Sequence, residues 1–121
     1  SNKKNKYSYN SSDIVCLKGC GNYIIVFFEY NDKLKHQIIR NTLLSAEEIL
    51  NKKTFLRCHK SYILNCEKIH SVIGNLKELK INTKILDFEI PVSRNISKKD
   101  YQYLLQKVKV KNNVEKVEKS K

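Results

Sequence analysis

The alternation of strand-forming runs and turn-forming clusters constrains the fold of this chain more than any other feature of its sequence. The run YIIVFFEY at residues 23–30 is dense in β-branched and aromatic side chains, which favour strands. A Gly- and Asn-containing cluster at residues 19–22 precedes this run, and an Asn-Asp pair provides a turn before residues 34–40. Together with a strand-like run at residues 13–18, the pattern predicts an antiparallel meander.

The second half of the chain repeats this organisation with shorter runs. Apolar and β-branched residues recur in brief segments, two of which are followed by a Gly-Asn or an Asn-Thr pair, and such pairs are typical of turns. The predicted strands lie at residues 55–57, 61–64, 69–73, 76–81 and 85–92.

Two other segments show the period of helices. Apolar residues between positions 43 and 51 follow helical spacing, and the tetrapeptide SAEE that starts at Ser45 has the form of a capping box. A second capping pattern starts at Ser97 and predicts a C-terminal helix from about Lys98, with an apolar stripe. The fold class is therefore mainly β, with one short central helix and a C-terminal helix.

The length of 121 residues fits a single domain. We predict a polar leader at residues 1–12, a folded domain at 13–108 and a frayed, Lys/Glu-rich tail at 109–121. No apolar run approaches the roughly 20 residues that span a bilayer, and no signal-peptide core is present, so we expect a cytoplasmic location. The Ser-Asn start indicates an excised fragment, so we also expect a receiver, sensor or membrane domain elsewhere in the parent chain.

The charge balance favours an anionic partner. The sequence has 24 Lys and Arg residues against 12 Asp and Glu residues, a formal net charge of +12. Nucleic acid is the leading partner for such a chain, but a lysine-rich genome or an anionic membrane surface would produce the same excess. Charge alone does not separate these readings.

Four cysteines allow either disulfides or metal ligands. Cys16 and Cys20, together with Cys66 and His70, would supply two pairs of zinc ligands, but the sequence has no CxxC knuckle. Reduced structural cysteines are the favoured interpretation, because Cys16 lies in a strand-like run where a small buried side chain fits. We predict no bound metal and no cofactor.

No pattern of catalytic residues is present. The sequence lacks a Gly-rich phosphate loop, a GxSxG elbow and an HExxH motif. Cys58 and His59 are neighbours in sequence, and adjacent residues of a strand point to opposite faces, so they do not form a nucleophile pair. We predict that the domain is not an enzyme.

A basic cluster at residues 57–61, RCHKS, lies between two apolar runs. Its guanidinium, imidazole, ammonium and hydroxyl groups suit phosphate oxygens and the acceptors of guanine. Alternatively, Arg57 or His59 is a structural hydrogen-bonding residue, and the sequence leaves both readings open.

A second basic cluster lies where the last predicted strand gives way to the C-terminal helix. Arg94 and Asn95 are the residue types best suited to bidentate reading of guanine and adenine. Lys98 and Lys99 occupy the first helical turn, where positive charge opposes the helix macrodipole but suits a bound phosphate. The alternative is an ordinary solvated helix start. Asn22 is a third candidate, although turn chemistry alone favours a plain tight turn at this position.

A family resemblance joins these clusters. The segment FLRCHKSYILN at residues 55–65 resembles the F-x-R-x-H-x-S-[YF]-[IVL]-[IVL]-N core of LytTR domains. The segments GNY at 21–23, RNTL at 40–43 and IPVSR at 90–94 are similar to the family's turn before its second strand, the start of its helix and its closing I-P-[VI]-S-R. The similarity spans about residues 13–105.

This resemblance implies an elongated fold of antiparallel meanders in small stacked sheets, which binds duplex DNA through loops that enter successive major grooves. It also implies pairs of protomers on repeated promoter half-sites. Carried over by position, Arg94 is the main base reader, Asn22 a second one and Lys60 a phosphate contact. The candidate DNA-binding residues are Asn22, His59, Lys60, Ser61, Arg94, Asn95 and Lys98.

We therefore interpret the chain as the sequence-specific DNA-binding output domain of a bacterial transcription regulator, of the response-regulator kind found in two-component systems. The alternative is a basic β module that binds a protein or an anionic surface without reading DNA sequence. That module would bind polyanions regardless of sequence and would not depend on Arg94.

Overall fold

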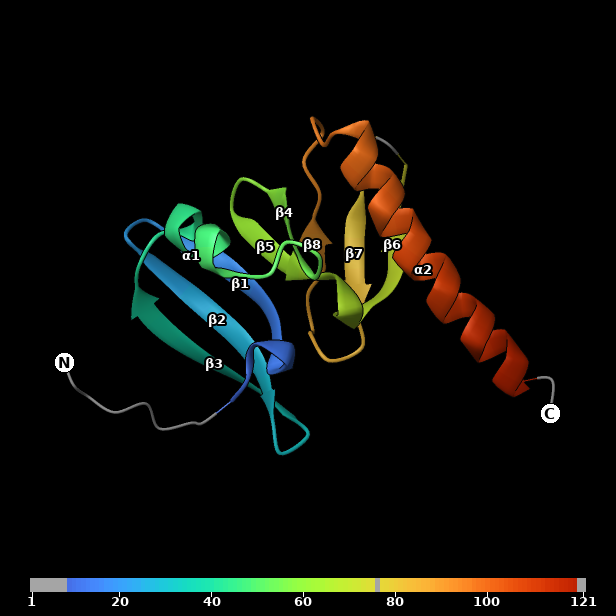
Figure 1. Cartoon of the computed structure of the whole chain (residues 1–121), viewed down its shortest axis with the longest axis horizontal. Helices are drawn as coiled ribbons and strands as arrows, with labels where there is room; N and C mark the ends of the chain where they lie inside the picture. The colour runs from blue at the N-terminus through green and yellow to red at the C-terminus, as the bar shows by residue number, and fades with distance from the viewer. Residues whose placement is uncertain (1–8, 76, 120–121) are drawn as a thin grey trace.

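The computed structural model describes residues 9–75 and 77–119, with side chains up to Val108. Its strands form two antiparallel sheets, one with five strands in the order β3-β2-β1-β5-β4 and one with three in the order β6-β7-β8 (Figure 1). The predicted class, mainly β with two helices, is confirmed. The elements are β1 (Ile14–Cys20), β2 (Tyr23–Tyr30), β3 (Lys33–Arg40), α1 (Leu43–Ile49), β4 (Phe55–His59), β5 (Tyr62–Asn65), β6 (Ile69–Ile73), β7 (Lys80–Thr83), β8 (Ile90–Pro91) and α2 (Lys98–Lys119), with short 3-10 turns at Ser11–Asp13 and Cys66–Lys68.

The five-stranded sheet packs on both of its faces, so the domain has two hydrophobic clusters. One face packs against α1 and against Tyr9, whose ring stacks on Phe28 with 4.0 Å between centroids. The opposite face packs against the three-stranded sheet and α2, and Phe27 meets Phe88 edge to face at 5.3 Å. The buried residues between the two sheets and α2 include Cys16, Tyr62, Leu64, Ile69, Ile81, Ile90 and Leu104.

A β-bulge in β1 allows one strand to serve both clusters. The pairing of β1 with β2 shifts register between Ile14 and Cys16. As a result Val15 and Cys16 both face the inter-sheet cluster, whereas Ile14 and Leu17 face α1. An extra residue in one strand breaks the strict alternation of side chains in this way.

Several predicted boundaries are confirmed. Asn31 and Asp32 adopt left-handed φ angles of 53° and 64°, as a two-residue hairpin turn between β2 and β3 requires. The C-terminal helix begins at Lys98, where the Ser97 hydroxyl accepts a hydrogen bond from the Asp100 amide at 3.1 Å. Ser97 therefore caps α2 as predicted.

Other boundaries are wrong. The predicted capping residue of the central helix, Ser45, lies inside α1, because Thr42 caps the helix and accepts from the Ser45 amide at 3.1 Å. The predicted polar step at Cys58 and His59 belongs to β4. Cys58 is buried, so its side chain contributes to the core rather than to a solvated turn.

The predicted turn at Asn82 and Thr83 and the long strand at 85–92 are also wrong. Asn82 and Thr83 pair with β6, and Thr83 is buried, so tertiary packing overrides the turn preference of these residues. The Thr83 hydroxyl accepts from the Leu86 amide at 3.1 Å, which turns the chain and leaves only β8 (Ile90–Pro91) in the ladder. The predicted strand at 76–81 is replaced by β7, and residue 76 lies outside the described residues.

None of the helices in the described ranges 9–75 and 77–119 is long and apolar enough to cross a membrane. The predicted leader, domain and tail boundaries at residues 12 and 108 stay predictions.

Candidate nucleic-acid interface

Three connections lie on one side of the molecule, which we call the loop edge: the β1–β2 turn at residues 20–23, the β4–β5 turn at 59–62 and the segment 93–97 before α2 (Figure 1). The antiparallel pairing of β1 with β5 sets Lys18 opposite Tyr62, and the Gly19 amide donates to the Ser61 carbonyl at 2.8 Å. The end of β1 and the start of β5 therefore meet at the same edge of the sheet. The β2–β3 turn lies on the opposite side (Figure 1).

The β4–β5 turn is joined directly to the segment before α2. The Ser93 amide donates to the Cys58 carbonyl at 2.8 Å, and the Cys58 thiol donates to the Pro91 carbonyl at 3.6 Å. A groove of about 550 Å³ opens between the two connections, lined by His59, Lys60, Leu79, Pro91, Val92, Ser93, Arg94, Asn95, two charged residues of the β6–β7 connection and one at the start of β7. The structure therefore brings together four of the candidate residues, His59, Lys60, Arg94 and Asn95.

The remaining candidates lie outside that groove. Asn22 is exposed in the β1–β2 turn, Lys98 is exposed at the start of α2, and Ser61 is half-buried in the β4–β5 turn. Ser61 contributes through its backbone, since its carbonyl accepts from Gly19 and its amide donates to the His59 ring.

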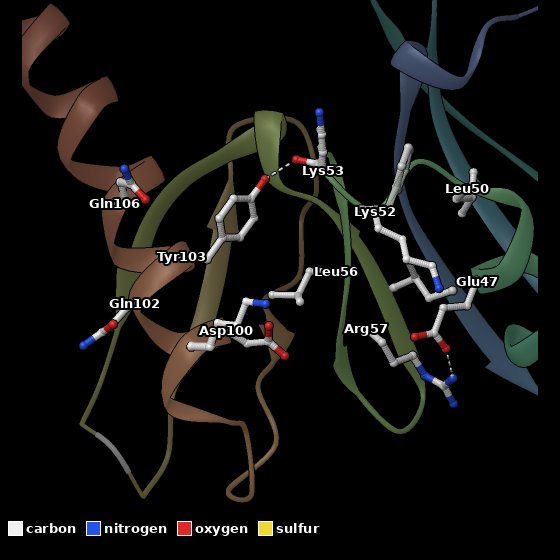
Figure 2. Close-up of a pocket in the computed structure, with 13 residues that line it drawn as sticks. Glu47, Leu50, Lys52, Lys53, Leu56, Arg57, Asp100, Gln102, Tyr103 and Gln106 are labelled. Atoms are coloured by element: carbon white, nitrogen blue, oxygen red, sulfur yellow. Dashed lines mark hydrogen bonds and ion pairs between the residues drawn. The ribbon is translucent and has the colours of Figure 1, made fainter.

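Arg57 holds the β4–β5 turn. Its guanidinium donates to the carbonyls of His59 at 3.1 Å and Lys60 at 2.8 Å, and it forms an ion pair with Glu47 of α1 at 2.9 Å. Figure 2 shows Arg57 and Glu47 facing each other. Of the two readings left open for Arg57, the structure supports the one in which it is a structural hydrogen-bonding residue.

His59 also has an internal partner. Its Nδ1 accepts a hydrogen bond from the Ser61 amide at 3.0 Å, so Nδ1 carries no proton and the neutral ring carries its proton on Nε2. Burial, together with the positive charges of Lys60 and Arg57, lowers the pKa of His59 below its ordinary value of 6.5. His59 therefore presents a neutral N–H donor from Nε2 at neutral pH.

The segment before α2 carries exposed side chains on a fixed backbone. The Asn95 amide donates to the Ser93 hydroxyl at 3.1 Å, and the Ile96 amide donates to the Ser93 carbonyl at 3.2 Å. Arg94 and Asn95 are exposed beyond this turn. Two polar side chains that suit base edges therefore stand on a backbone that hydrogen bonds hold in place.

The β1–β2 turn depends on glycine at two positions. Gly21 has a left-handed φ of 62°, and the Asn22 carbonyl accepts from the Asn41 amide at 3.0 Å. At Gly19, a Cβ atom would lie 2.9 Å from Cδ1 of Leu43, so a larger residue there would require the Leu43 side chain of α1 to shift. These contacts hold the turn while leaving the Asn22 side chain exposed.

Three of the four cysteines lie in the core of the described part of the chain. Cys16, Cys58 and Cys66 are buried and Cys20 is exposed. Burial raises the pKa of the Cys58 thiol to about 12, which keeps it protonated at neutral pH. Among the described residues, no group of three or more His, Cys, Asp or Glu side chains is arranged to hold a metal ion.

A larger groove of about 670 Å³ lies between β4 and α2 and contains none of the candidate residues. The Tyr103 hydroxyl bonds the Lys53 carbonyl within it, and Arg57 and Glu47 lie at its other end (Figure 2). Its size would make this groove the candidate binding site, but the candidate base-reading side chains lie on the loop edge instead.

Sequence reasoning missed Lys77, Glu78 and Lys80, which line the loop-edge groove. It placed them in a predicted strand at 76–81, whereas the strand begins at Lys80. The Gly74-Asn75 pair was the available signal, since Asn75 organises the connection beyond it: its side chain accepts from the Lys77 amide at 2.9 Å.

Comparison with known proteins identifies the family and a similar fold. The LytTr DNA-binding domain family matches residues 4–104 of the chain. A solved structure of the LytTr DNA-binding domain of a protein from Bacillus cereus, named as a methyl-accepting/DNA response regulator, superposes with a TM-score of 0.64 at 22% identity. That match covers 78% of this chain and 82% of the other. No match is found among curated proteins. Because the family match extends over most of its length, the chain belongs to the LytTr DNA-binding domain family.

Proposed function

We propose that this domain binds duplex DNA in a sequence-specific manner by inserting its loop edge into the major groove. Arg94 and Asn22 read base edges, Lys60 contacts phosphate, and His59, Asn95 and Lys98 provide further donors. The Ser61 amide and carbonyl hold the central turn in position. The DNA-binding unit spans residues 13–108 and has no catalytic role.

The convergence of the β4–β5 turn and the segment 93–97 on one groove is the main support for this proposal. Arg94 and Lys60 come from connections 34 positions apart in sequence, yet both line that groove. Base reading needs side chains whose positions are fixed, and the backbone bonds of Ser93, Asn95 and Ser61 meet this requirement. The major groove, about 12 Å wide, admits protein elements of this kind.

The family and the response-regulator name of the Bacillus cereus protein support a proposal for the wider setting. We propose that the domain is the output module of a bacterial response regulator that acts in the cytoplasm. Its parent would carry a receiver, sensor or membrane domain, and two protomers would bind repeated half-sites in a promoter. A dimer on repeated sites places its half-sites about one helical turn of DNA, or a multiple of it, apart.

The test is selection of preferred duplexes from a random-sequence pool, followed by titration of the selected and scrambled duplexes. Wild type should prefer its selected sequence by at least about 10³-fold, and Arg94→Ala should lose about 1–3 kcal/mol of that preference. Asn22→Ala should lose preference at a different base position.

Two lysine variants complete the experiment. Lys60→Ala should weaken binding to every duplex. It should also reduce the slope of log affinity against log salt by the amount expected for about one phosphate contact. Lys33→Ala removes the same charge from the opposite side of the molecule, next to the β2–β3 turn, and should leave the preference unchanged. If wild type binds every duplex equally and Arg94→Ala behaves like Lys33→Ala, the domain is a basic anion-binding module instead.

A further inference from the structure

The β6–β7 connection adds positive charge to the groove that contains Arg94. Lys77 and Lys80 line this groove together with Lys60 and Arg94, so four cationic side chains surround a space of about 550 Å³. Glu78 is the one acidic residue in the described lining. The groove therefore has an excess of three positive charges.

These cations have no acidic partner among the ion pairs of the described residues. The described pairs are Arg57 with Glu47, Lys68 with Glu29 and Lys107 with Glu67. Lys60, Lys77, Lys80 and Arg94 take part in none of them. Like charges that converge on a groove repel one another, and an anion placed between them relieves this repulsion.

Backbone hydrogen bonds fix the β6–β7 connection against the segment that carries Arg94. The Asn75 side chain accepts from the Lys77 amide at 2.9 Å, its carbonyl accepts from the Glu78 amide at 2.9 Å, and the Val92 amide donates to the Leu79 carbonyl at 3.0 Å. Gly74 has a φ of +97°, and a Cβ atom there would lie 2.2 Å from the Glu78 carbonyl oxygen. These contacts hold the described residues on either side of position 76 in place beside the segment that carries Arg94.

We infer that this groove holds a backbone phosphate of the bound DNA, with Lys77 and Lys80 as its contacts on the side opposite Lys60. This inference rests on the proposed function. The phosphate contact positions the duplex so that Arg94 meets a base edge, because phosphate contacts set register while base contacts set sequence. The Glu78 carboxylate repels the phosphate and so lowers the affinity of the groove for DNA.

The experiment measures the affinity of the whole chain for its selected duplex and for a scrambled duplex over a range of salt concentrations. Lys77→Ala and Lys80→Ala should each weaken binding to both duplexes by the same factor. Because both lysines contact one phosphate, the double variant should lower the slope of log affinity against log salt by about 0.9, and each single variant by part of that amount. Lys77→Arg and Lys80→Arg should retain both properties, which a purely structural role in the loop does not require.

Removing the negative charge of Glu78 should change DNA affinity in the opposite direction. Glu78→Gln should raise the affinity for both duplexes several-fold at low salt, with less gain at high salt because screening shortens the reach of the charge. Two controls match these changes on the opposite side of the molecule: Lys33→Ala for the lysines, and Glu89→Gln in the β7–β8 connection for Glu78. Both controls should bind DNA like wild type.

The outcomes separate this inference from the proposed function. If the Lys77 and Lys80 variants bind like Lys33→Ala while Arg94→Ala loses sequence preference, the phosphate contact is wrong and the sequence-reading role stands. If those variants lose affinity in a protein without any preference, the contact stands and sequence reading is wrong. Saturable binding of inorganic phosphate, with unchanged DNA affinity in the variants, would assign the groove to a free anion and overturn the inference. A wild-type chain that binds no DNA overturns both.

Discussion

Neighbouring residues of the basic segment 57–61, at the end of β4 and in the β4–β5 turn, have different structural roles. Arg57 directs its guanidinium inward to two carbonyls of the turn, and His59 uses Nδ1 to accept from the Ser61 amide. Lys60, at the tip, is exposed. The Arg57 and His59 side chains therefore stabilise the turn, whereas the Lys60 side chain is available to an anion.

His59 provides a pH-dependent test at this scale. Because its folded-state pKa lies below 6.5, the unfolded chain binds the proton more readily in the window between the two values. The contribution of His59 to stability is therefore complete above pH 6.5 and is lost as pH falls through the folded-state value. NMR titration of the imidazole should give a midpoint below 6.5, and nitrogen shifts should report a proton on Nε2.

His59→Gln should flatten the dependence of unfolding free energy on pH in that window, while retaining a side chain able to hydrogen bond. A midpoint at or above 6.5, or a ring protonated on Nδ1, would contradict the assigned hydrogen bond with Ser61.

At the scale of elements, Arg57 connects α1 to the β4–β5 turn through Glu47. Arg57→Ala should lower the free energy of unfolding by about 1–2 kcal/mol, because two carbonyl hydrogen bonds are lost along with a partly exposed ion pair. Chemical denaturation measures this loss. DNA affinity should also fall, since Lys60 is then less firmly positioned.

The control for this prediction is Glu47→Gln, which removes the ion pair and leaves the carbonyl bonds in place. It should destabilise the domain by less than about 1 kcal/mol. If Arg57→Ala instead leaves stability unchanged and lowers the salt dependence of DNA binding by one contact, Arg57 binds phosphate rather than the turn.

Much of the fold was predictable from local pattern. The first hairpin was predicted because residues 23–40 combine strand-forming runs with a short polar turn, and the α2 start was predicted from its Ser97 cap. The β7–β8 region was not, since Thr83 is a strand residue only because it pairs with Ile69 and is buried. Such tertiary pairing leaves little trace in local sequence.

The candidate interface was predictable in part for a similar reason. Arg94, Lys60 and Asn22 were identified from two basic clusters, a turn and a family resemblance, and their assignment to DNA contacts stays a prediction. The sequence offered a structural role for Arg57 as one of two alternatives and could not choose between them, because its partners are a residue of α1 and backbone carbonyls. Lys77 and Lys80 were missed because their proximity to Arg94 depends on the Val92 to Leu79 hydrogen bond between distant segments.

At the scale of the whole molecule, the arrangement of the loops distributes the net charge of +12 unevenly over the surface. Lys60, Lys77, Lys80 and Arg94 gather at one groove on the loop edge. The opposite side carries, in its connections and at the start of β3, three exposed acidic residues, Asp32, Asp87 and Glu89, against two exposed lysines, Lys33 and Lys84 (Figure 1). This distribution favours approach to a polyanion with the loop edge leading.

The most direct test of DNA binding by the loop edge is a map of backbone amide shifts in the domain as its selected duplex is added. The largest changes should fall in residues 20–23, 59–62 and 93–97, with the β2–β3 turn at Asn31 and Asp32 unaffected. Changes centred on the β2–β3 turn, or on the groove between β4 and α2, would contradict DNA binding at the loop edge.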